Sequence, residues 1–98
     1  MEKITKPTVS VLAAGADFIA KQMSAASGDL LPEHQASVES ALFIHEGSCI
    51  LKINGEDVLL HSGEAFVIPA QTRHQIKALT DFKGIHFMPK NIEFKFFS

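Results

Sequence analysis

The sequence contains a single cysteine, Cys49, and no cluster of basic residues. One cysteine cannot form a disulfide within the chain, which favours a reducing compartment. The net charge is −2, so the chain lacks the excess of Lys and Arg that nucleic-acid phosphates require. We therefore expect no nucleic-acid partner.

The sequence also lacks the long apolar runs of membrane proteins and secretion signals. The apolar run near its start, residues 9–14, is short and is soon followed by Asp17 and Lys21. A membrane span needs 18 or more apolar residues, and a signal peptide needs a longer uncharged segment. We therefore expect a cytoplasmic protein with no membrane partner.

Common catalytic signatures are missing as well. The sequence has no glycine-rich phosphate loop after a strand, no nucleophile elbow and no zinc-type pair of cysteines. Its acidic residues are scattered, with no spacing that would fix two of them as a glycosidase pair. The hydrophobic pattern and the histidines are the features that indicate its fold and function.

The 98 residues, 46% of them hydrophobic, suit one globular domain with one modest core. Short runs separated by turns, such as residues 40–45, 48–53 and 74–78, fit strands whose successive side chains divide between two faces. Asn54-Gly55 is a strong hairpin signal, because both residues tolerate the positive φ angles of a type I′ turn. Residues 17–26 fit a strand by alternation and a helix by their alanines, and the later strands favour a strand. The pattern predicts an all-β sandwich or barrel.

Two groups of residues in this pattern have a characteristic spacing. The first group is Gly28, His34 and Gly47, and the second is Gly63, Pro69 and His74. They resemble the two motifs of the cupins, small double-stranded β-helix (jelly-roll) barrels, which read Gly-x5-His-x-His-x3-Glu-x6-Gly and Gly-x5-Pro-x-Gly-x2-His-x3-Asn. The resemblance implies one cupin-like domain with its barrel core over residues 28–90. Residues 1–27 would form an N-terminal arm and the first strands, and residues 91–98 a last strand.

The departures from these motifs concern the metal site. In the family, the two histidines and the glutamate of the first motif and the histidine of the second hold a divalent metal. Here Ala36 and Ser40 stand at two of the four ligand positions, so only His34 and His74 remain. The second motif also has Gln71 for its second glycine and Ala78 for its asparagine.

Two neutral imidazoles make a poor metal site, because open sites usually keep three protein ligands. A third ligand would have to come from Glu39, Cys49 or His86. The alternative is that His34 and His74 line the barrel and are hydrogen-bonded to backbone or water. We therefore expect no cofactor, and weak binding of any divalent transition metal.

The resemblance favours a small-molecule-binding or sensing protein with a degenerate metal site and an unidentified ligand. The predicted pocket residues are His34, Ala36, Ser40, Leu42, His74 and Ile76. The alternative is a cupin-type enzyme, either a metal-dependent dioxygenase or a histidine-based isomerase or epimerase, in which no catalytic residue is assigned. A structural module is the third class, if side chains fill the barrel.

The end of the chain is rich in phenylalanine. Phe94, Phe96 and Phe97 together exceed what a small barrel is expected to bury. An unpaired, aromatic last strand would offer a surface to a second copy of the chain. We therefore predict a homodimer joined through the terminal strands.

Overall fold

The computed structural model describes residues 3–97, and these residues form strands and turns without a helix. The ten strands are β1 (Thr8–Ala14), β2 (Phe18–Ala25), β3 (His34–Ala36), β4 (Ser40–Glu46), β5 (Ser48–Ile53), β6 (Glu56–His61), β7 (Ala65–Ile68), β8 (His74–Ala78), β9 (Phe82–Pro89) and β10 (Phe94–Phe96). The predicted all-β fold is confirmed. Residues 1, 2 and 98, the outer ends of the predicted arm and last strand, lie outside the described residues.

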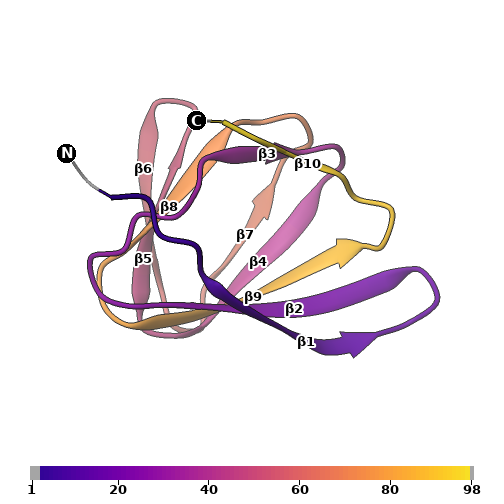
Figure 1. Cartoon of the computed structure of the whole chain (residues 1–98), viewed down its shortest axis with the longest axis horizontal. Helices are drawn as coiled ribbons and strands as arrows, with labels where there is room; N and C mark the ends of the chain where they lie inside the picture. The colour runs from indigo at the N-terminus through magenta and orange to yellow at the C-terminus, as the bar shows by residue number, and fades with distance from the viewer. Residues whose placement is uncertain (1–2, 98) are drawn as a thin grey trace.

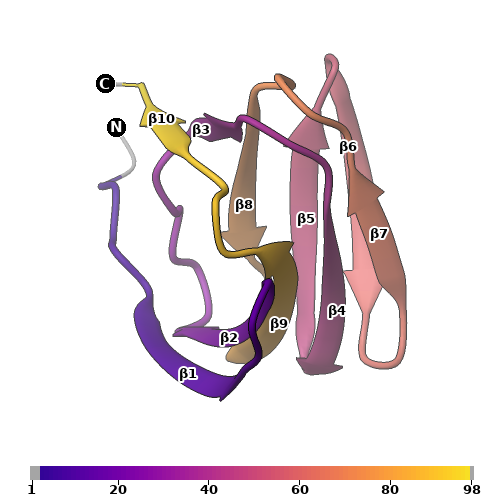
Figure 2. The ribbon, with the colours of Figure 1, turned by 90° about the vertical axis from the view of Figure 1, so that its right-hand side faces the viewer.

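The strands form two five-stranded antiparallel sheets in the orders β1-β2-β9-β4-β7 and β10-β3-β8-β5-β6. Figures 1 and 2 show the two sheets facing each other, with the short strands β3 and β10 side by side at one end. The sheets enclose the interior as the two halves of a jelly roll, and they are not joined into one closed barrel. The described residues include no helix capable of spanning a membrane.

Alternation along the strands decides which side chains enter the space between the sheets. In β4, Ser40, Leu42 and Ile44 are buried, whereas the side chains between them are more exposed. Strand β5 repeats the pattern with Cys49, Leu51 and Ile53. Each fully buried Leu or Ile stabilises the fold by about 1.5–3 kcal/mol relative to an exposed one. The buried core draws side chains from both sheets, and it includes Leu31, which lies just before β3.

Positive φ angles occur where the sequence predicted tight turns. Asn54 and Gly55 have φ values of 53° and 75°, as a type I′ hairpin between β5 and β6 requires. Gln71 has a φ of 58°, at the position where the cupin motif has glycine. A positive φ favours glycine, which explains why the motif has glycine at this position. In this chain Gln71 adopts the same left-handed geometry, and its backbone N–H donates to the carbonyl oxygen of Ala36 (2.8 Å).

The predicted homodimer stays a prediction. Phe94 and Phe96 remain partly exposed, but their rings also contact the ring of His34, with centroids 5.5 and 5.3 Å apart. The aromatic end of the chain therefore covers part of its own interior.

Gly47 provides a test of the turn that joins β4 to β5. It has a φ of 79°, and a Cβ there would overlap the carbonyl oxygen of Asp81. Gly55 has a similar φ but open space around it. We expect Gly55→Ala to lower the free energy of unfolding by about 1 kcal/mol and Gly47→Ala by at least about 2 kcal/mol more, because only the latter adds a backbone clash. Urea unfolding of the two variants measures the difference, and equal losses would contradict this packing.

Candidate functional site

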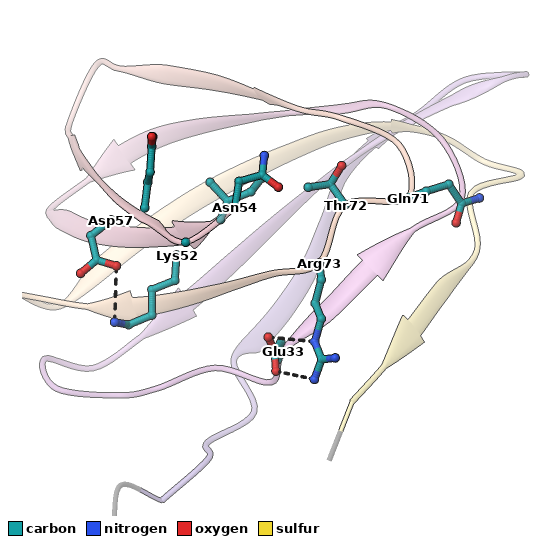
Figure 3. Close-up of a pocket in the computed structure, with 10 residues that line it drawn as sticks. Glu33, Lys52, Asn54, Asp57, Gln71, Thr72 and Arg73 are labelled. Atoms are coloured by element: carbon teal, nitrogen blue, oxygen red, sulfur yellow. Dashed lines mark hydrogen bonds and ion pairs between the residues drawn. The ribbon is translucent and has the colours of Figure 1, made fainter.

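Two hollows among the described residues differ greatly in character. The first, about 550 Å³, lies around the β5–β6 hairpin and the loop before β8 (Figure 3). Four of its charged side chains are already paired, Arg73 with Glu33 at 3.0 Å and Lys52 with Asp57 at 3.5 Å. None of the histidines lines it. Its wall is mostly hairpin and loop surface with little free charge, so it is a weak candidate for a ligand site.

The second hollow is a cavity of about 840 Å³ at the end of the jelly roll that β3 and β10 cover. Most of its wall is apolar, and the residues that form this part include Met23, Leu31, Ile76, Met88, Phe94 and Phe96. Two histidines, His34 and His86, also line it. A mostly apolar cavity with a few polar groups is the usual form of a small-molecule site.

His34 and His74 are brought together by strand pairing. They are directly opposite each other on β3 and β8, and their ring centroids are 4.3 Å apart. His34 lines the cavity, and His74 lies behind it with only 2% of its surface exposed. The two remaining histidines of the motifs therefore lie on adjacent strands inside the fold.

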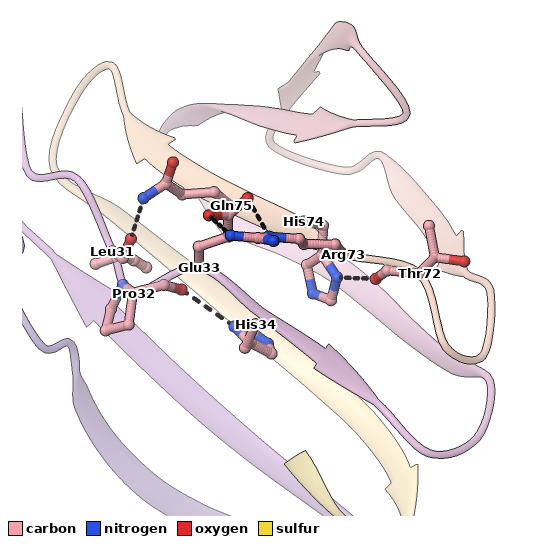
Figure 4. Close-up of polar contacts among 8 residues, drawn as sticks. All are labelled: Leu31, Pro32, Glu33, His34, Thr72, Arg73, His74 and Gln75. Carbon is pink, nitrogen blue, oxygen red and sulfur yellow. Dashed lines mark hydrogen bonds and ion pairs between the residues drawn. The ribbon is translucent and has the colours of Figure 1, made fainter. Parts of the chain in front are cut away.

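Backbone carbonyls fix the protonation of both rings (Figure 4). Nδ1 of His34 donates to the carbonyl oxygen of Pro32 (3.1 Å), and Nδ1 of His74 donates to that of Thr72 (2.9 Å). A carbonyl oxygen can only accept, so each neutral ring carries its proton on Nδ1 and leaves Nε2 with a free lone pair. In each case the carbonyl belongs to the residue two positions earlier in the chain.

His86 is the third histidine of this region. It lies on β9, is 8% exposed, and its Nε2 is 2.7 Å from Oγ of Ser40. Ser40 stands at the glutamate position of the cupin motif, so the shorter side chain now contacts a histidine. The sequence had named His86 as a candidate ligand but gave no sign of this hydrogen bond.

Burial lowers the pKa of all three imidazoles. Loss of solvent is the main cause at His34 and His74, and the hydrogen bonds to Pro32 and Thr72 oppose it. The pKa of His86 falls to about 4, first through burial and then through the charges of His34, His74 and Lys21. Near pH 7 the site therefore presents neutral imidazoles, which can accept a proton or a hydrogen bond.

The other predicted pocket residues lie behind the cavity wall, except for Ile76. Ile76 lines the cavity, Ser40 lies behind His86, and Ala36 and Leu42 are buried without lining it. Lys21 is a lining residue that the site prediction missed. The alternation within β2 shows that Lys21 shares a face with Met23. It does not show that this face lies beside His86 on β9.

The candidate metal ligands do not form a three-ligand site. Glu39 is exposed, and Cys49 lies in the hydrophobic core, where burial raises the pKa of its thiol to about 11. Within residues 3–97, no three His, Cys, Asp or Glu side chains are grouped so that they could hold a metal ion. His34 and His74 have the tautomer of a metal ligand, but two imidazoles alone do not fit a tightly bound ion.

The pKa of His86 predicts a pH-dependent stability. The native state resists protonation of His86 down to about pH 4, whereas the unfolded chain protonates it near 6.5. The stability that depends on a neutral His86 is therefore fully present above pH 6.5, and it is lost as the pH falls towards 4. Between pH 7.5 and 5, His86 alone should cost about 2 kcal/mol of unfolding free energy.

Comparison with His86→Gln isolates this effect, since the carboxylates titrate alike in both proteins. Urea unfolding at pH 7.5 and 5 should show a loss about 2 kcal/mol smaller in the variant. The same loss in both proteins would mean that His86 is not held neutral by its surroundings.

Comparisons with known proteins agree with this architecture. A family model described as a cupin domain matches residues 22–87. A search of curated proteins finds no match. Among solved structures, a cupin superfamily protein from Desulfitobacterium hafniense DCB-2 has a TM-score of 0.78 at 17% identity, over 91% of this chain and 82% of that one.

Two further structures are similar. KdgF from Halomonas sp. has a TM-score of 0.75 at 25% identity, over 83% of this chain and 76% of that one. Salicylate 1,2-dioxygenase from Pseudaminobacter salicylatoxidans has a TM-score of 0.84 at 14% identity, and the match covers 97% of this chain but only 31% of the dioxygenase. The family match spans most of the sequence and the fold agrees with it, so this chain belongs to the cupin family.

Proposed function

We propose that this cupin binds a small, mostly apolar molecule in the 840 Å³ cavity. The observation that carries the proposal is the combination of that volume with neutral imidazoles in and behind its wall. An interior filled by side chains would have favoured a structural module. A ligand would place its apolar body against side chains such as Leu31 and Met88, and a hydrogen-bond donor towards Nε2 of His34.

A second candidate function is proton transfer by a histidine. The two free Nε2 atoms are what a general base requires, and the carbonyls of Pro32 and Thr72 hold the rings in that tautomer. This arrangement favours the isomerase or epimerase alternative over the dioxygenase, because it uses residues that are present. Exchange of a ligand C–H for deuterium in heavy water would mark an enzyme, and unchanged ligand would mark a binder.

The location of the ligand can be tested with introduced tryptophans, because the chain has none. Val9 lines the cavity and is 54% exposed, while Val67 on β7 is 57% exposed and does not line it. We expect ligands found by screening aromatic fragments to change the fluorescence of Val9→Trp and not that of Val67→Trp. Binding that leaves the Val9→Trp emission unchanged would place the site elsewhere.

The metal content of the protein tests the degenerate site. Two neutral imidazoles leave the charge of a divalent ion uncompensated, so we expect well under one equivalent of transition metal after dialysis against chelator. The double variant Ala36→His with Ser40→Glu should bind more, because it restores an imidazole and a carboxylate. Elemental analysis compares the two proteins. Stoichiometric metal in the native protein that disappears in His34→Ala would reveal a third ligand.

A further inference from the structure

The cavity has a one-sided distribution of charge. Lys6 and Lys21 both line it, together with His34 and His86, and no Asp or Glu is among its described lining residues. The chain as a whole has a net charge of −2, so this positive wall does not follow from the composition. An apolar wall of low dielectric beside such charges strengthens their field on a molecule bound against it.

Lys21 is placed at this wall by the sheet. It pairs directly with His86 across β2 and β9, and residues opposite each other in an antiparallel pair project from the same face. Its charge reaches the imidazole, since it contributes to lowering the pKa of His86. Lys21 therefore lies on the cavity side of β2, opposite His86.

Lys21 also lacks the acidic partner that a half-buried lysine usually has. The structure gives it no hydrogen bond or ion pair with any described residue, whereas Lys52 pairs with Asp57 and Lys83 with Glu46. A partly buried ammonium without a counter-charge is costly, and an anion from outside would relieve that cost. Lys6, on the segment before β1, adds a second positive charge to the same cavity.

The remaining wall determines what kind of anion fits. Met23 and Leu31 line this part of the cavity, and Phe94 and Phe96 line it on the β10 side. These surfaces exclude a strongly hydrated ion such as free phosphate, which would lose its water without gaining enough donors in return. They suit an aromatic or aliphatic body that carries one anionic group.

On the basis of the proposed function, we infer that the ligand is a small apolar carboxylate, with its carboxylate at Lys21 and its apolar body between Met88 and the β10 phenylalanines. Nε2 of His34 is then free to accept a hydrogen bond from a hydroxyl or amide of the ligand. The choice of a carboxylate follows from the two lysines that line the cavity, and the choice of an apolar body follows from the rest of the lining.

The test uses two probes of the same shape, 2-naphthoate and 2-naphthamide, which differ in charge. Calorimetry should give at least about tenfold tighter binding of the naphthoate. Lys21→Met should remove most of this preference, because it weakens the binding of the naphthoate far more than that of the naphthamide. The matched control is Lys90→Met, which loses the same charge from an exposed lysine outside the cavity and should change neither affinity.

The outcomes separate this inference from the proposed function. Equal affinities for the two probes, with both changing the fluorescence of Val9→Trp, would overturn the carboxylate and keep the cavity as a binding site. A naphthoate preference that survives Lys21→Met, or that Lys90→Met abolishes equally, would also overturn it. If neither probe binds and no aromatic fragment changes that fluorescence, the proposed function itself is wrong.

Discussion

Two hydrogen bonds from histidine rings to backbone carbonyls determine what this site can do. Nδ1 of His34 and Nδ1 of His74 each donate to a carbonyl oxygen two residues earlier, and strand pairing sets the two rings 4.3 Å apart. The bonds leave both Nε2 atoms as acceptors, and burial lowers the pKa of each ring so that it stays neutral. The proposed ligand binding and the alternative of proton transfer would both use these acceptor nitrogens.

Around this pair, the site differs from the metal centre that its motifs imply. Ala36 removes one imidazole, and Ser40 replaces a carboxylate with a hydroxyl that contacts His86. Among the described residues, no Asp or Glu lines the cavity and none pairs with Lys21. A carboxylate at position 40 would add a negative charge behind this wall, and its replacement by Ser40 is in keeping with the anionic ligand that we propose.

The sequence predicted the fold well because its signals were local. Alternation located the strands, Asn54-Gly55 located a hairpin, and the motif spacing singled out His34 and His74, which the structure pairs on neighbouring strands. The site was predicted less completely because its remaining parts depend on pairing between distant strands. The contact of Lys21 with His86 arises from the register of β2 on β9, which a single sequence does not encode in any short pattern.

The most direct test of this account is the tautomeric state of His34 and His74, measured by long-range proton–nitrogen NMR at pH 7.5. The account predicts two neutral rings, each with its proton on Nδ1 and an unprotonated Nε2. The carbonyl oxygens of Pro32 and Thr72 can only accept a hydrogen bond, so they favour the Nδ1-protonated tautomer of each ring. Rings that are protonated at that pH, or that carry the proton on Nε2, would contradict the account.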